Sequence, residues 1–150
     1  MAKYERILVA TDGSELSELA VQSAIDLALL MGAEIVAVNV VRRDPTGYFE
    51  ASVVLEQEDI DRLIEQVNAG AQRVVDTVKA AADAKGVKST RTTVIQAELV
   101  GEAIIEAARA HHCDLIVMAS HGRRGIKRLL MGSETLHVLT HSHTPVLVLR

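Results

Sequence analysis

The sequence predicts an α/β fold: one domain over residues 1–150, built on an open five-stranded parallel sheet with helices on both faces. Apolar, β-branched runs of strand length alternate with longer segments of helical periodicity. Hydrophobic residues make up 49% of the chain and aromatic residues only 2%, so Val, Leu, Ile and Ala must build the core. A chain of 150 residues can bury about 70% of the surface that it exposes when unfolded, and it needs no second domain.

The N-terminal part of the chain predicts a strand at 7–10, followed by a helix. The continuous apolar run is typical of a strand that is covered on both faces. Apolar residues then recur at helical spacing up to Met31, with Ser14 as the expected N-cap and Gly32 as the stop signal. A second β-branched run at 35–41 completes a first βαβ unit.

A long helix and a third strand follow. Apolar residues from Ile60 to Ala81 alternate in steps of four and three, which predicts a helix with one narrow apolar stripe. Gly86 is expected to end it. The segment 90–95 is β-rich but less apolar than the other strands, so we expect it near an edge of the sheet.

The C-terminal part predicts two further helices and two further strands. A helix is expected within 98–111, a buried strand at 113–118, a helix from Ser133 to about His141, and a last strand at 145–150. Because parallel strands are joined by right-handed crossovers, the alternation of strands and helices predicts a mostly parallel sheet.

The charge balance excludes some classes of partner. A net charge of -4 and a pI near 5.8 argue against a nucleic-acid-binding protein, which needs a basic face. No apolar run approaches the ~20 residues of a membrane span, and the N-terminus is charged where a signal peptide would be apolar. The single Cys113 cannot form an intramolecular disulfide and is expected in the core. We therefore expect a cytoplasmic protein.

The most informative motif is a loop after the fourth strand. Ala119-Ser120-His121-Gly122 is followed, nine residues on, by Gly132-Ser133 at the start of a helix. Glycines let backbone N–H groups approach a phosphate, and a helix N-terminus favours negative charge. The charged residues between Gly122 and Glu134 are all basic: Arg123, Arg124, Lys127 and Arg128. Charge alone favours a solvated basic face, but the glycines favour phosphate binding.

Two polar residues each allow two interpretations. Ser133 is either a simple N-cap or a hydroxyl that caps the helix while it touches phosphate or a bound Mg²⁺. Asp12 either organises a turn or accepts hydrogen bonds from a ribose hydroxyl at the end of the first strand. Ligands of open α/β sheets bind at the carboxyl ends of the strands, so we expect Asp12 to lie near the loop from Ala119 to Ser133.

Together, these segments resemble the universal stress protein family. The resemblance is carried by residues 7–15, 36–40, 114–122, 132–133 and 144–148, and it covers essentially the whole chain in the right order. It implies a Rossmann-like, adenine nucleotide alpha hydrolase-like sheet with the strand order 3-2-1-4-5. Ala119 replaces the first glycine of the motif of the ATP-binding branch. Its methyl group either crowds the ribose or is tolerated where the backbone angles are ordinary.

The resemblance also implies a nucleotide site. It places the adenine against Ala10 and the backbone of Val40, and it places Asp12 with the backbone of Met118 and Ala119 around the ribose. The phosphates are expected chiefly at the main-chain N–H groups of Gly122, Arg123, Gly132, Ser133 and Glu134. The carboxylate of Glu134 should point away from the phosphates or reach them through a metal. The other expected site residues are Thr11 and His121.

The implied function is that of a dimeric regulatory or stress-response protein. It would bind ATP, or ADP or AMP, with or without Mg²⁺, and it would pair through the last strand, Val146 to Leu149, and contact an unidentified protein partner. Alternatively, that strand is simply buried, and the chain is a nucleotide-free dimeric interaction module. The sequence lacks a Walker motif, so we expect no catalytic residue and at most slow hydrolysis.

Histidines near the C-terminus also allow two interpretations. His137 and His141 lie at i, i+4, and His143 is close by, which is a spacing that can bind a transition metal. Without an expected Cys or acidic ligand beside them, a surface helix end is favoured, and no metal site is expected.

Overall fold

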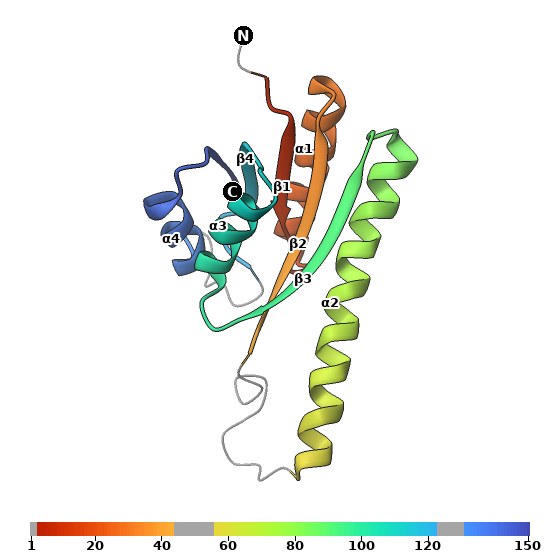
Figure 1. The fold of residues 1–150 in the computed structure, drawn as a ribbon, viewed down its shortest axis with the longest axis vertical. Helices are drawn as coiled ribbons and strands as arrows, with labels where there is room; N and C mark the ends of the chain where they lie inside the picture. The colour runs from red at the N-terminus through yellow and green to blue at the C-terminus, as the bar shows by residue number, and fades with distance from the viewer. Residues whose placement is uncertain (1–2, 44–55, 123–130) are drawn as a thin grey trace.

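The computed structural model describes residues 3–43, 56–122 and 131–150 of the chain (Figure 1). Strands and helices alternate throughout these ranges, as predicted. The elements are β1 (Arg6–Ala10), α1 (Glu15–Met31), β2 (Glu34–Arg42), α2 (Gln57–Lys85), β3 (Thr90–Ala97), α3 (Val100–Ala110), β4 (Leu115–Ala119), α4 (Ser133–His141) and β5 (Val146–Leu149). None of the helices described is long and apolar enough to cross a membrane.

The described strands form one parallel sheet in the order β3-β2-β1-β4-β5, which confirms the predicted fold class and strand order. β3 lies at an edge, as its composition predicted. β1 and β4 are neighbours although most of the chain separates them in sequence. The loops that follow these two strands therefore meet at the carboxyl edge of the sheet, where open α/β sheets bind ligands.

Two apolar cores lie on opposite faces of the sheet because successive strand residues point to opposite sides. Ile7 and Val9 pack with α1 and α2 on one face. Leu8, Val36 and Met118 pack with α3 and α4 on the other face. Covering both faces explains why the inner strands are continuous apolar runs.

The predicted helix ends are confirmed where the caps are local in sequence. Ser14 is the N-cap of α1, and its hydroxyl accepts a hydrogen bond of 3.3 Å from the Ser17 N–H. Gly32 and Gly86 follow α1 and α2 with φ of 67° and 93°, in the left-handed region that favours glycine. α2 continues through Gly70 without interruption.

β5 lies at the edge opposite β3, and it is not a buried strand. The residues from Val146 to Leu149 are partly or largely exposed, and Leu147 keeps 40% of its surface accessible. The interpretation of this run as a simple buried strand is therefore wrong. Its apolar side chains reflect an open sheet edge.

Polar groups satisfy one another at the amino ends of the strands. The Asp114 carboxylate accepts hydrogen bonds from the Glu5 N–H at 2.9 Å and the Arg6 N–H at 3.1 Å, which ties the starts of β1 and β4 together. Arg6 donates to the Glu34 carboxylate at 2.8 Å and to the His111 carbonyl at 2.8 Å. The Arg6 hydrogen bond holds the pKa of Glu34 below its ordinary value of 4.5.

Candidate functional site

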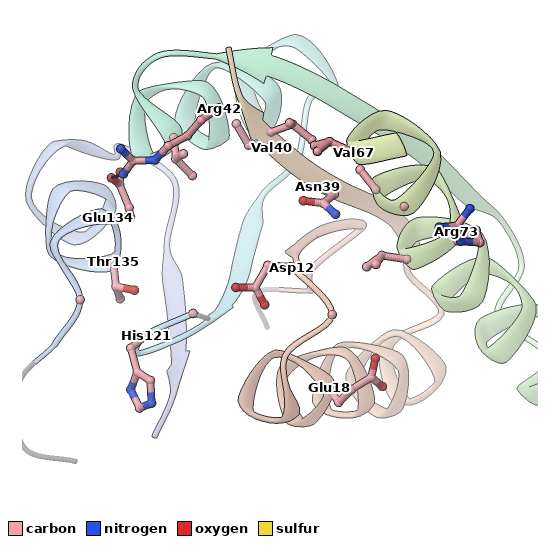
Figure 2. Close-up of a pocket in the computed structure, with 18 of the residues that line it drawn as sticks. Asp12, Glu18, Asn39, Val40, Arg42, Val67, Arg73, His121, Glu134 and Thr135 are labelled. Carbon is pink, nitrogen blue, oxygen red and sulfur yellow. Dashed lines mark hydrogen bonds and ion pairs between the residues drawn. The ribbon is translucent and has the colours of Figure 1, made fainter. Parts of the chain in front are cut away.

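A cleft of about 1040 Å³ opens at the carboxyl ends of β1, β2 and β4 (Figure 2). Its walls come from the loop after β1, the end of β2, one face of α2, the loop after β4 and the start of α4. Seven of the predicted site residues line it, namely Asp12, Val40, His121, Gly122, Gly132, Ser133 and Glu134. Its volume is at the upper end of the range of small-molecule sites.

Asp12 and Gly122 meet at this cleft, as the topology predicted. The Asp12 carboxylate accepts a 2.9 Å hydrogen bond from the Ser14 N–H, so it does organise the turn into α1. A β-carbon at Gly122 would overlap the carboxylate of Asp12. Glycine lets the loop after β4 approach the Asp12 carboxylate in this position, and a larger residue would require that carboxylate to move.

The start of α4 is fixed to the end of β4 by two hydrogen bonds. The Gly132 N–H donates to the Ser120 carbonyl at 2.7 Å, and the Thr135 hydroxyl donates to the Ala119 carbonyl at 2.8 Å. A β-carbon at Gly132 would lie 3.2 Å from the Ser120 carbonyl oxygen, which is a tight fit. The first turn of α4, whose N–H groups have no acceptors within the helix, is thereby held in the wall of the cleft.

The prediction of Ser133 as the N-cap of α4 is wrong. Gly132 is the N-cap residue, with extended backbone angles, and Ser133 is the first residue of the helix. Glycine is an acceptable N-cap, and the tight approach to the Ser120 carbonyl excludes a larger side chain there without adjustment. The Ser133 hydroxyl is therefore not engaged as the cap, and it lies in the cleft wall.

The Glu134 carboxylate is held by groups on two other elements. One oxygen accepts a 2.8 Å hydrogen bond from the Gly101 N–H in the first turn of α3, and the other lies 3.2 Å from the Arg42 guanidinium (Figure 2). A carboxylate at a helix N-terminus also complements the helix dipole. These partners direct the carboxylate toward α3 and Arg42.

Four further predicted site residues, which the structure describes, do not line the cleft. Thr11, Met118 and Ala119 are buried, and the Thr11 hydroxyl is bonded to Ser17 at 3.0 Å. Ala10 is partly buried and packs against the core on the α3 and α4 side. Arg123 lies outside the described residues, as do Arg124, Lys127 and Arg128.

Ala119 matters most among these residues because it replaces a motif glycine. It is 7% exposed, and it shares the face of β4 with Val117, which packs in the core beneath α1. Its backbone is that of an ordinary strand, since among the described non-glycine residues only His112 has a positive φ. The methyl group is therefore not part of the cleft wall, and the backbone at this position does not require glycine.

Several residues that line the cleft were not predicted from the sequence. Seven of them belong to α2, more than to any other element, and the others include Glu18, Asn39 and Arg42. Arg42 could have been suspected from its position directly after the second predicted strand. The α2 residues gave no such signal, because they belong to a helix whose apolar stripe predicted only packing. The cleft-lining residues of α2 are Gln66, Val67, Gly70, Ala71, Arg73, Val74 and Thr77.

Two other groups have ordinary structural surroundings. His137 lies 3.0 Å from the Glu102 carboxylate, and its ring stacks on that of His141 with centroids 4.2 Å apart. No cluster of three potential metal ligands occurs among residues 3–43, 56–122 and 131–150. Cys113 lies in the core, where burial raises the pKa of its thiol to about 11, so it is protonated at neutral pH.

Comparison with known proteins identifies relatives whose similarity covers nearly the whole chain. Universal stress protein MJ0531 of Methanocaldococcus jannaschii is 35% identical over 148 residues, which cover 98% of this chain and 82% of that protein. Universal stress protein UspA from Lactobacillus plantarum has a solved structure with a TM-score of 0.79 at 25% identity, and the match covers 100% of both chains.

A third protein of this fold was solved with a ligand. It is a universal stress protein in complex with cAMP, with a TM-score of 0.72 at 24% identity and 99% coverage of both chains, and it shows a shared fold. The model of the universal stress protein family matches residues 3–150. The chain therefore belongs to the universal stress protein family.

Proposed function

We propose that this protein binds an adenine nucleotide, with ATP as the expected ligand, in the cleft at the carboxyl ends of β1, β2 and β4. The observation that carries the proposal is the arrangement of Asp12, Gly122 and the first turn of α4 around one cavity. A carboxylate suits ribose hydroxyls, while a helix N-terminus beside a glycine loop suits phosphates. The cleft thus offers one group suited to the ribose of a nucleotide and another suited to its phosphates.

The surroundings of Ala119 support nucleotide binding over a nucleotide-free module. A methyl group that is buried against the α1 side of the sheet does not narrow the cleft. The cAMP seen with the related universal stress protein belongs to that protein, and at 24% identity it supports only the capacity of this fold to hold an adenine nucleotide. Nucleotide binding by this chain is inferred from its own residues.

The expected role is regulatory rather than catalytic. A fast ATPase needs a positioned base and an activated water, and the described part of the cleft offers Asp12, which is bonded to the Ser14 N–H. Bound Mg²⁺ would be held chiefly by the phosphates, and the hydroxyl of Ser133, in the cleft wall, would be available to it. We expect hydrolysis to be slow and the bound state to act through a partner or a second copy in the cytoplasm.

The open edge at β5 supports a homodimer. Leu147 of β5 and Leu136 and Leu139 of α4 are 40%, 56% and 40% exposed. Pairing of two copies along β5 would cover an edge that is otherwise free to pair with other strands. Leu147→Asp should shift the protein from dimer to monomer in sedimentation analysis, and an unchanged mass would contradict this interface.

Calorimetric titration with ATP, ADP and AMP tests the nucleotide proposal. We expect binding by the native protein and, because the methyl group of Ala119 is buried outside the cleft, an affinity of Ala119→Gly within about threefold of native. Ala110→Val, at an exposed helix end away from the cleft, is the control variant and should bind ATP with native affinity. No heat from the native protein at millimolar ATP would refute nucleotide binding. Binding that appears only in Ala119→Gly would favour the nucleotide-free interaction module.

A further inference from the structure

Asn39 is a buried polar residue in the wall of the cleft. It lies near the end of β2 and is 7% exposed. Val38 and Val40 point toward α3 and α4, so Asn39 points to the opposite face, toward α2. Figure 2 shows its carboxamide in the cleft, between Asp12 on one side and the α2 residues Val67 and Arg73 on the other.

The carboxamide of Asn39 makes no hydrogen bond to any residue in the described ranges. The residue is nearly buried, but its amide atoms stay open to the cleft, where water or a ligand can bond to them. A Leu of similar size would bury apolar surface in place of this hydrated amide. The strand around it is apolar from Ile35 to Val41. Fold stability therefore does not account for a polar side chain at this position.

The described part of the chain offers an internal comparison in Thr90. Its hydroxyl is buried without a hydrogen-bond partner, whereas the amide of Asn39 is open to the cleft; Thr90 begins the edge strand β3, at the other end of the sheet, and does not line the cleft. Asn39 differs because its unpaired groups face a cavity that is large enough for a ligand.

The wall opposite the sheet leaves room for a ligand to reach this depth. Gly70 of α2 lines the cleft, and a β-carbon there would have only the Arg73 guanidinium, at 3.6 Å, within 4 Å. Glycine costs about 1 kcal/mol relative to alanine in a helix interior, and no contact among the described residues requires it here. The open space therefore continues along α2 beside the end of β2.

We propose that Asn39 recognises the nucleoside part of the bound nucleotide and sets its specificity. This inference rests on the proposed function. A carboxamide offers both a donor and an acceptor, so its partner is a group that can do both: a ribose hydroxyl or the edge of the base. Asp12 approaches the same ligand from β1, and Asn39 approaches it from β2.

The test compares the native protein with Asn39→Leu and Asn39→Ala, titrated with ATP, 2′-deoxy-ATP and ITP. We expect both variants to bind ATP about tenfold more weakly than native, because each loses a buried hydrogen bond to the ligand. Loss of the native preference for ATP over 2′-deoxy-ATP identifies the ribose hydroxyl as the partner. Loss of the preference for ATP over ITP identifies the base edge.

Thermal unfolding of the same variants separates recognition from a role in folding. Asn39→Leu should have a Tm equal to or above the native value, and Thr90→Val is the matched control, with equal ATP affinity and no loss of Tm. If the native protein binds ATP and both Asn39 variants bind it equally well, this inference is wrong and the proposed function stands. A Tm several degrees lower for Asn39→Leu would also overturn it. If the native protein binds no nucleotide, both proposals fail.

Discussion

The two ends of the parallel sheet differ in how their polar groups are used. At the amino ends, the charged groups of Arg6, Glu34 and Asp114 are engaged with one another or with backbone groups. At the carboxyl ends, Asn39 has no hydrogen-bond partner among the described residues, and the first turn of α4 faces a cleft. The polar groups at the amino ends of the strands are therefore paired within the protein, while some of those at the carboxyl ends face an open cleft.

The difference teaches where substitutions should affect stability and where they should affect binding. Breaking a hydrogen bond at the amino end leaves protein groups without partners, which lowers the free energy of unfolding. Changing a cleft group that has no partner among the described residues, such as Asn39, removes only contacts to a ligand. If a substitution changes ATP affinity much more than the free energy of unfolding, or the reverse, the two ends are separate in this sense. If both quantities change equally, they are not.

The largest effect is expected for Gly122→Ala at the carboxyl end. The new β-carbon would overlap the Asp12 carboxylate and displace it, so ATP should bind about 100-fold more weakly, equivalent to ~2.7 kcal/mol. Gly122 itself is exposed, but the displaced carboxylate also accepts the Ser14 N–H, so the free energy of unfolding should fall by about 1 kcal/mol, less than the loss in binding. Calorimetry and urea unfolding measure the two effects. Native-like ATP affinity in this variant would show that Asp12 is not part of the site.

The next largest effect is expected for Asp114→Ala at the amino end. Two backbone N–H groups lose their acceptor, which should lower the free energy of unfolding by about 2 kcal/mol. ATP affinity of the folded protein should stay within twofold of native. Asp114→Asn keeps an acceptor oxygen and is the matched variant, with an intermediate loss. A large loss of ATP affinity in Asp114→Ala would contradict the separation of the two ends.

A smaller effect is expected for Glu134→Gln. Glu134 lines the cleft and is hydrogen-bonded to α3. The amide keeps an acceptor for the Gly101 N–H and removes the charge that faces Arg42. Because both side chains are substantially exposed, stability should fall by less than about 1 kcal/mol. Without the negative charge, ATP affinity should rise about threefold. Competition binding measures the change, and a weaker affinity would mean that the ligand uses the carboxylate.

The smallest effect is the pH dependence that Glu34 contributes at the amino end. Its pKa is lowered from 4.5 by the hydrogen bond from Arg6, so the folded protein binds its proton less readily than the unfolded chain. The stabilisation is complete at pH values well above 4.5 and is lost as the pH falls below that value. The stability difference between native and Glu34→Gln should shrink between pH 6 and pH 3 in urea unfolding. A difference that is independent of pH would refute the role of this pair.

Local sequence signals predicted the elements of this fold well. Ser14 and Gly32 mark the ends of α1 because each acts through backbone groups within four residues of itself. The apolar runs predicted the inner strands because both faces of the sheet are covered. Ser133 was mistaken for the N-cap of α4 because the tight contact between Gly132 and the Ser120 carbonyl involves residues twelve positions apart.

The candidate site was only partly predictable. Asp12 and the glycine loop were expected to meet because the carboxyl ends of parallel strands share one edge. Asn39 lies inside an apolar run, and strand periodicity does not reveal which buried position faces an opening. Gly70 and Arg73 lie on a helix whose sequence indicates packing alone, so their place in the cleft wall depends on how far α2 extends beside β2.

The sequence by itself determined the class of fold, the strand order expected from the family resemblance and the positions of the turns. The fold class and the turns depend on periodicity and capping, which act over a few residues, whereas the strand order came from the resemblance to a family. The tertiary structure alone decided that Ala119 is buried away from the cleft, that Glu134 is held by α3 and Arg42, and that Asn39 faces an open cavity. Each of these facts depends on groups that are distant in the chain, and their approach is fixed only when the sheet and its helices pack together.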